Sequence, residues 1–282
     1  MNNLKNSTIN AITFFDDVVN LKKNTKSDPT YKVRVNLLRN DIQNKFNEYD
    51  TLFVKNNLVT INPFGYTNQD KVDLLKLYSY QSKIIQKLKN SITTTEHNRI
   101  INTCQNCTIS EVNSFDHIIP KNEFPEFSVN PKNLFPSCTI CNGYKSEVWR
   151  HNGTNLFLNL YLDKLPLQQY LFVLLDIKNN NIDVKFIIDN RNKIEQNLFD
   201  LLYNHYLKLR LTQRFEKSSH DIIIELKNSI LEFKNHINKT KIQEATKGKI
   251  IRDKEIFGQN YWKAILTEEL INNDDFIDPL LI

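Results

Sequence analysis

The chain has 282 residues, enough for one large domain or two modest ones. Hydrophobic residues make up 40% of it and charged residues 24%, with five glycines, so the composition excludes fibrous and largely disordered proteins. A formal net charge of +5 suits a polyanionic partner such as nucleic acid, but many basic proteins bind none, so charge alone assigns no function.

The N-terminal segment lacks the features of a secretory signal. Its apolar patch is interrupted by Asp16 and Asp17, and no small-residue cleavage site follows. The longest strongly apolar run, Tyr170 to Ile177, has about eight residues, whereas roughly twenty are needed to cross a bilayer. We therefore expect a cytoplasmic protein without a membrane partner, in which thiols stay reduced and paired cysteines hold metal rather than form disulfides.

The part before the first cysteine is predicted to be helical. Apolar residues recur at helical spacing over residues 33–54 and again over residues 70–89. The stretch between them contains Pro, Gly and Asn, which favour a loop, and Asn68 or Asp70 is the candidate N-cap of the second helix. Residues 1–100 are therefore predicted to form an N-terminal helical region.

All four cysteines occur as two C-x-x-C pairs, Cys104 with Cys107 and Cys138 with Cys141. One tight turn brings both sulfurs of a pair within about 2.3 Å of one ion, and two pairs complete a tetrahedral Zn²⁺ site. The alternatives are two disulfides, a redox-active pair or chance, and the paired spacing in a reducing compartment favours zinc. Four sulfurs leave no open coordination position, so this zinc is predicted to be structural.

Between the cysteine pairs, the segment Phe115 to Lys121 contains adjacent Asp116 and His117. Neighbouring side chains of a regular strand point to opposite faces, so the pair can act together only where a strand ends or bends. Pro120 supplies such an end. An isolated Asp-His pair is common by chance, so its surroundings must carry any catalytic interpretation.

A helix is predicted to start at the second cysteine pair. It would place Asn142, Lys145 and Trp149 on one face, where one side chain could ligate a cation while the next holds a phosphate. Taken singly, Asn142 is better explained as a helix cap and Lys145 as a solvated charge.

The C-terminal region, residues 151–282, is predicted to contain a β-hairpin followed by helices. Two runs rich in β-branched and aromatic residues, 170–178 and 182–190, flank an Asn-rich turn at Asn179 to Asn181. Helical periodicity then resumes over residues 194–211, 220–237 and 255–271. The basic stretch 234–254 could follow a phosphate backbone or be a solvated helical face.

The ordered set of C-x-x-C, Asp-His-Ile-x-Pro, Asn-Leu, C-x-x-C-Asn and a lysine resembles the HNH nuclease family over about residues 104–149. The resemblance implies a ββα-metal core, in which a β-hairpin and a helix surround a catalytic metal. The expected fold class is therefore α+β, with this core at residues 101–150 embedded in a mostly helical protein that has an additional β-hairpin.

Carried over residue by residue, the resemblance makes His117 the general base and Asp116 and Asn142 the ligands of a catalytic Mg²⁺ or Mn²⁺. It makes Asn133 the asparagine that braces the loop and the histidine, and Lys145 a phosphate-holding cation. Asn142 stands where other members have histidine, a variant that the family also uses. The residue types are consistent with these roles, because carboxylate and amide oxygens suit Mg²⁺ or Mn²⁺ and a neutral imidazole accepts a proton from water.

Two residues compete for these roles. Asn130 is a nearby competitor for the bracing asparagine, although only Asn133 precedes a leucine as the pattern requires. Lys121 is a second candidate for holding a phosphate, beside Lys145.

The expected function is metal-dependent hydrolysis of phosphodiester bonds in DNA. A ribonuclease of the same mechanism is an alternative, because nothing in the loop reads a sugar hydroxyl. A non-catalytic, zinc-stabilised nucleic-acid-binding or scaffold protein is another. A looser resemblance to bacterial anti-phage defence HNH nucleases of the Septu type implies a defence effector with a regulatory partner such as an ATPase.

Overall fold

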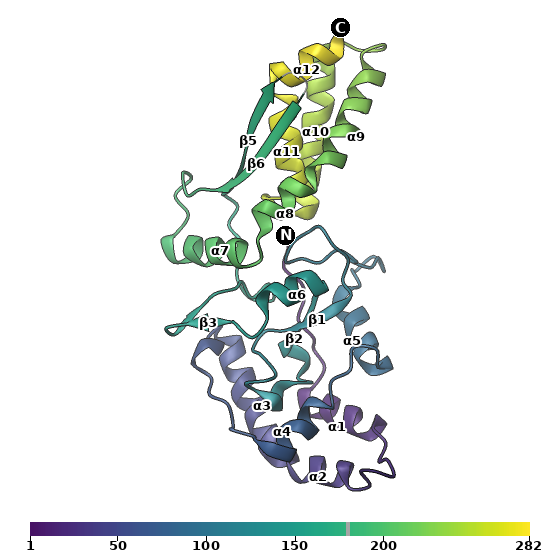
Figure 1. The fold of residues 1–282 in the computed structure, drawn as a ribbon, viewed down its shortest axis with the longest axis vertical. Helices are drawn as coiled ribbons and strands as arrows, with labels where there is room; N and C mark the ends of the chain where they lie inside the picture. The colour runs from purple at the N-terminus through teal and green to yellow at the C-terminus, as the bar shows by residue number, and fades with distance from the viewer. Residues whose placement is uncertain (179–180) are drawn as a thin grey trace. The chain divides into compact units, whose positions relative to one another are not determined.

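The computed structural model describes residues 1–178 and 181–282 and confirms the predicted α+β class (Figure 1). The chain divides into two compact units. The first, called the N-terminal unit, comprises Asn3–Asn106 and Ser110–Lys164, and the C-terminal unit comprises Leu165–Ile282 with Met1–Asn2 and Cys107–Ile109. The domain boundaries expected after residues 100 and 150 stay predictions. Across the described ranges, no helix combines the length and apolar character that crossing a membrane requires.

The N-terminal unit begins with helices that bury aromatic and aliphatic side chains. In α3, for example, Ile42, Phe46, Tyr49 and Phe53 recur at helical spacing and are all buried. The helical elements are α1 (Ala11–Leu21), α2 (Tyr31–Leu37), α3 (Arg39–Val54), η1 (Leu58–Thr60), α4 (Asn68–Leu75) and α5 (Lys83–Thr93).

The two stretches with helical periodicity, for which two or three helices are expected, are each divided in two. The first breaks at Leu38, where α2 ends and α3 begins, and the second breaks between Leu75 and Lys83. Helical periodicity continues through both breaks, so the apolar pattern could not reveal them. The second break leaves residues 76–82 outside any helix, and part of this segment contributes to the site described below.

The predicted N-cap of α4 was also wrong. Thr67 occupies the cap position, and Asn68 begins the helix with a left-handed φ of 47°. Asparagine tolerates this conformation better than most residues do, because its short polar side chain bonds locally.

The ββα core is present. Strand β1 (Ser114–His117) pairs antiparallel with β2 (Leu134–Ser137), so that His117 lies opposite Leu134, and α6 (Thr139–Lys145) follows β2 closely. Both strands are buried along their whole length. The connection between them contains η2 (Pro125–Phe127) and η3 (Pro131–Asn133). Because β1 ends at His117, the Asp-His pair stands at the strand terminus, as expected.

Helix α6 is shorter than predicted. Ser146 has a left-handed φ of 50° and accordingly ends the helix after Lys145. Trp149 therefore does not share a helical face with Asn142; its ring instead meets the edge of Phe124 at a centroid distance of 5.7 Å. Two short strands, β3 (Arg150–His151) and β4 (Thr154–Asn155), follow.

The C-terminal unit contains the predicted hairpin followed by helices. Strands β5 (Leu171–Lys178) and β6 (Asn181–Ile188) pair antiparallel, and β5 contacts α11 while β6 contacts α8. The turn residues Asn179 and Asn180 lie outside the described residues. The helices are α7 (Gln196–Lys208), α8 (Leu211–Lys217), α9 (Ser219–Phe233), α10 (Lys239–Phe257), α11 (Trp262–Ile271) and α12 (Asp274–Leu281).

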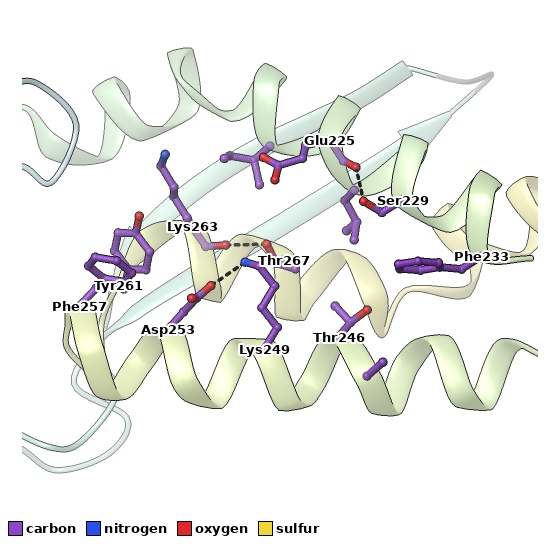
Figure 2. Close-up of a pocket in the computed structure, with 13 residues that line it drawn as sticks. Glu225, Ser229, Phe233, Thr246, Lys249, Asp253, Phe257, Tyr261, Lys263 and Thr267 are labelled. Atoms are coloured by element: carbon purple, nitrogen blue, oxygen red, sulfur yellow. Dashed lines mark hydrogen bonds and ion pairs between the residues drawn. The ribbon is translucent and has the colours of Figure 1, made fainter. Parts of the chain in front are cut away.

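A cavity of about 530 Å³ lies among α9, α10 and α11 of this unit (Figure 2). Phe233, Phe257 and Tyr261 contribute aromatic rings to its lining. Two of the charged side chains in its lining compensate each other, because Lys249 pairs with Asp253 at 2.7 Å. Glu225 and Asp253 contribute carboxylates to this lining, but no imidazole does, so the cavity lacks the general base that the sequence predicts.

Candidate functional site

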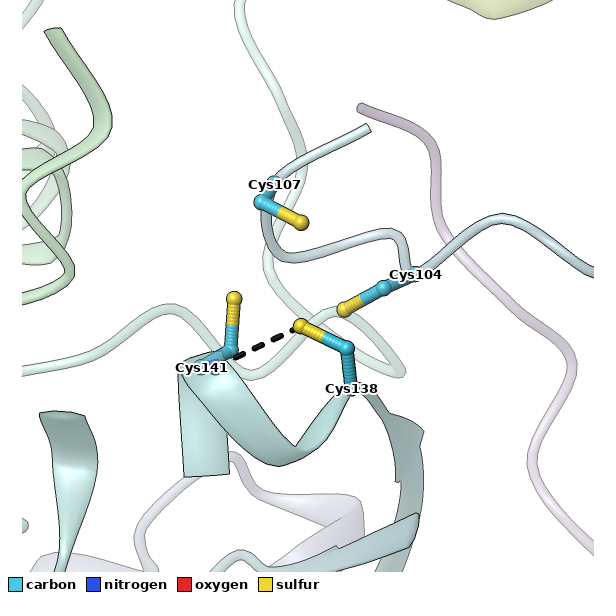
Figure 3. A group of neighbouring side chains, drawn as sticks. All are labelled: Cys104, Cys107, Cys138 and Cys141. Atoms are coloured by element: carbon cyan, nitrogen blue, oxygen red, sulfur yellow. Dashed lines mark hydrogen bonds between the residues drawn. The ribbon is translucent and has the colours of Figure 1, made fainter. Parts of the chain in front are cut away.

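The four cysteines come together although thirty residues separate the two pairs (Figure 3). All four are buried, and their Sγ atoms lie within 4.8 Å of one another. A tetrahedral ion with bonds of about 2.3 Å would hold its sulfurs about 3.8 Å apart. A small contraction of the cluster is enough to reach this spacing. The cluster thus fits a structural metal ion such as zinc, with no position left for a substrate.

Local polar contacts also orient two of these sulfurs. Cys138 is the N-cap of α6, and its Sγ accepts a hydrogen bond of 3.3 Å from the Cys141 backbone N–H. Ser137 Oγ lies 3.7 Å from Cys104 Sγ and accepts a hydrogen bond from Asn106. Polar contacts of this kind stabilise negative charge on thiolates and fix the direction of metal ligands.

A second cavity, of about 320 Å³, opens at the end of β1, entirely within the N-terminal unit. Three of the predicted site residues, Asp116, His117 and Asn142, line it, whereas Asn133 and Lys145 are buried and contact residues near it. The full lining is Tyr78, Tyr80, Asn113, Ser114, Phe115, Asp116, His117, Pro120, Lys121, Thr139, Asn142, Ser146 and Glu147.

His117 is held on two sides. Its Nε2 lies 2.9 Å from the backbone oxygen of Ser128, and because a carbonyl can only accept, Nε2 carries the proton and Nδ1 remains a proton acceptor. The ring of Tyr78 meets the imidazole edge-on at a centroid distance of 4.7 Å. Burial lowers the pKa of His117 to about 3, so the imidazole is neutral at physiological pH.

Asp116 and Lys145 form a buried ion pair. Lys145 Nζ lies 2.8 Å from Asp116 Oδ1, with 7% of the lysine side chain and 9% of the aspartate side chain exposed. The same ammonium donates to the backbone oxygen of His117. Burial raises the pKa of Asp116, and the charge of Lys145 opposes this effect. Lys145 thus fixes the carboxylate and the end of β1, while Lys121 is the lysine that lines the cavity.

The side chain of Asn142 is bonded to the backbone immediately before Asp116. Its Nδ2 donates a hydrogen bond of 3.1 Å to the backbone oxygen of Phe115, the residue that precedes Asp116. With the amide nitrogen used in this way, Oδ1 is the atom left to bind a cation. A carboxylate and an amide oxygen at one cavity match the hard oxygen ligands that Mg²⁺ and Mn²⁺ prefer.

Asn133 spans the loop that follows His117. Its Oδ1 accepts from the Ile119 backbone N–H at 2.9 Å, and its Nδ2 donates to the backbone oxygens of Ile119 and Phe127 at 3.1 and 3.2 Å. These bonds make Asn133 a brace between two parts of the loop. The competitor, Asn130, caps η3 by accepting a hydrogen bond from Lys132 N, which is a purely local contact.

Sequence reasoning missed the aromatic wall of the cavity. Tyr78 and Tyr80 come from the break between α4 and α5, which the apolar pattern had extended as helix. Glu147 was also missed as a lining residue. None of these positions has a distinctive motif, since each contributes through its place in the folded unit.

The predicted basic stretch is largely neutralised by carboxylates of its own unit. Lys239 pairs with Asp274 at 2.7 Å, and it also pairs with Asp278. Lys254 pairs with Glu268, as Lys249 does with Asp253. An ion-paired helical surface therefore describes these lysines better than a continuous phosphate-binding face does.

Residues 104–147 match the family model described as HNH endonuclease. Protein ea31 of Escherichia phage lambda is 25% identical to the chain over 225 residues, which covers 74% of this chain and 75% of that protein. No solved structure gives a significant match. The family match encloses both cysteine pairs and the residues Asp116, His117, Asn133, Asn142 and Lys145.

Proposed function

From an HNH endonuclease domain at residues 104–147, we propose that the protein is a metal-dependent endonuclease that hydrolyses phosphodiester bonds in DNA. The observation that carries the proposal is the cavity at the end of β1. One neutral imidazole, one carboxylate and one amide oxygen line the same cavity, and each is fixed by a bond to neighbouring backbone or side chains. This combination provides a base and a hard-cation site within one small volume.

In the proposed reaction, His117 acts as the general base. Its Nε2–H is committed to Ser128, so Nδ1 takes a proton from water while the water oxygen forms a bond to phosphorus. The bond between phosphorus and the leaving oxygen breaks in the same displacement. A divalent ion, Mg²⁺ or Mn²⁺, would be held by Asp116 and Asn142 and would supply positive charge beside the leaving oxygen.

The lysines take separate roles in this proposal. Lys121 lines the cavity and is the candidate for contacting the substrate phosphate. Lys145 is buried against Asp116, so it holds the metal-binding carboxylate in place instead of contacting the substrate. The four-cysteine cluster, with zinc as its proposed ion, supports the start of α6 and thereby the position of Asn142.

We propose DNA as the substrate and a cytoplasmic defence role, as the looser resemblance to Septu-type nucleases implies, with a regulatory partner such as an ATPase. The relative ea31 is a phage protein, and its name states no activity. A ribonuclease is the alternative that a substrate panel separates. The intact set of Asp116, His117 and Asn142 supports an enzyme over an inert scaffold.

The test is a cleavage assay on plasmid, linear duplex DNA, single-stranded DNA and RNA, in metal-free buffer and with added Mg²⁺ or Mn²⁺. Cleavage of DNA by the wild type is expected only with the added ion, and His117→Ala should reduce it by a factor of about 10² or more, the range typical of a general base. The matched control is His97→Ala, which removes an exposed imidazole of the same unit. Cleavage by His117→Ala at the rate of the control would refute the assignment of the base.

A further inference from the structure

We infer that α4 and the segment after it, residues 68–82, position the general base from outside the HNH domain. This inference rests on the proposed function, because it assigns a purpose to the contacts that hold His117. Two independent contacts connect this segment to the imidazole, and an ion pair with a buried carboxylate holds the segment itself.

The first contact is the ring of Tyr78. It meets the His117 imidazole at 4.7 Å between centroids and an interplanar angle of 73°, the edge-on geometry that aromatic pairs favour. On the cavity side, Lys121 Nζ lies 5.8 Å from the centre of the same ring. Tyr78 therefore touches both the base and the lysine proposed to contact the substrate.

The second contact passes through Ser128. The backbone oxygen of this residue accepts the His117 Nε2 proton, and its side-chain Oγ donates a hydrogen bond of 2.8 Å to the backbone oxygen of Leu74 in α4. Ser128 is 1% exposed and Leu74 is fully buried. Because no water competes for these groups, a shift of α4 would move the acceptor that sets the imidazole's tautomer and orientation.

Helix α4 is itself fixed by Asp73. Arg34 binds this fully buried carboxylate in a fork, with Nε to Oδ2 at 2.6 Å and Nη2 to Oδ1 at 3.1 Å. Gln69 donates to Asp73 Oδ1, and the hydroxyl of Tyr31 donates to the Asp73 backbone oxygen. Bidentate, charge-assisted bonds of this kind restrict direction as well as distance. A connected series of contacts thus runs from Arg34 through α4 to the imidazole.

The consequence is a positioning role rather than a chemical one. An imidazole that acts as a base must point its free nitrogen at the attacking water, and a displacement of about 1 Å is enough to cost a large part of the rate. Neither Tyr78 nor Ser128 needs to touch the reacting atoms to exert this control. Loss of the contact should therefore lower kcat and leave KM nearly unchanged.

The kinetic test compares Tyr78→Ala, Tyr78→Phe and a control, Tyr66→Ala, on the DNA substrate that the wild type cleaves. Tyr66 is a buried tyrosine of the same unit, stacked on Phe64 at 4.5 Å and not lining the cavity, so its removal reports general destabilisation. We expect Tyr78→Ala to lower kcat about tenfold with KM changed less than about twofold, and Tyr78→Phe, which keeps the ring, to recover most of the rate. An equal loss of kcat in Tyr78→Ala and Tyr66→Ala would overturn the positioning role.

A second measurement does not depend on cleavage. The ¹⁵N chemical shifts of the His117 imidazole, recorded on the zinc-loaded protein without added Mg²⁺, distinguish the two neutral tautomers. The wild type and Tyr78→Phe should show the Nε2–H form, and Tyr78→Ala should show a shift toward a mixture. Absence of wild-type cleavage would count against the proposed function alone, whereas unchanged imidazole shifts in a folded Tyr78→Ala protein would refute the positioning by Tyr78.

Discussion

Replacement of Lys145 by methionine should destabilise the ββα core strongly. Met keeps the aliphatic length of lysine but leaves the Asp116 carboxylate without its partner at 2.8 Å, in surroundings where only 9% of the aspartate side chain is exposed. Removing one member of a buried ion pair typically costs about 3–5 kcal/mol, because the remaining charge stays desolvated. Even the lower value, about 3 kcal/mol, corresponds to more than a hundredfold change in an opening equilibrium.

Hydrogen exchange followed by mass spectrometry measures this effect locally, in peptides that contain β1 and β2. Exchange of their protected amides should accelerate about a hundredfold in Lys145→Met, and added Mg²⁺ should reverse part of it, because a cation next to Asp116 replaces the lost ammonium. The matched control is Lys132→Met, which breaks a more exposed pair with Asp50 and should cost less than about 1 kcal/mol. Equal acceleration in the two variants would show that breaking the buried Lys145 pair costs no more free energy than breaking the more exposed Lys132 pair.

Two further predictions concern the metal cluster and a buried acid. Cys141→Ser removes one ligand of the tetrahedral site, so the zinc content per chain and the melting temperature should both fall well below those of the wild type. Plasma mass spectrometry after gel filtration measures the zinc content, and an undiminished value would exclude the four-sulfur site. Burial raises the pKa of Glu126, whose Oε1 accepts a hydrogen bond from Phe64 N. The folded state therefore binds the carboxyl proton more tightly than the unfolded chain does, and stability is lost as the pH rises through the raised pKa. Glu126→Gln cannot ionise, so its free energy of unfolding should rise relative to that of the wild type as the pH increases above the ordinary pKa of glutamate. Urea titrations at a series of pH values measure this difference, and parallel pH profiles would contradict it.

The metal centre could be predicted from sequence because its ligand spacing is local. Two C-x-x-C pairs define tight turns whatever surrounds them, and the closed four-sulfur chemistry then identifies the ion as structural. The ending of β1 at His117 was equally accessible, since Pro120 limits the strand. The ends of α6 and α4 were not, because Ser146 and Asn68 adopt left-handed backbone conformations that only the folded neighbourhood selects.

The position of the Lys145 side chain could likewise not be predicted from the sequence. Its spacing from Asn142 indicated a charge near the site, and sequence reasoning directed it to a phosphate. In the structure the ammonium is buried against Asp116 and the backbone of His117, and Lys121 lines the cavity instead. Which of two nearby lysines faces solvent depends on the packing of α6 against β1, and that packing is a property of the whole unit.

The sequence by itself identified the residues of the proposed centre: the sulfur ligands, the imidazole of His117, and the oxygen donors proposed at Asp116 and Asn142, all of which lie within one short segment. Only the tertiary structure decided what holds that chemistry in place. Tyr78, Leu74 and Arg34 reach the imidazole through contacts between segments far apart in the chain. Such contacts arise from close packing and the pairing of buried polar groups, which depend on the complete fold and leave no periodic or motif signal in the sequence.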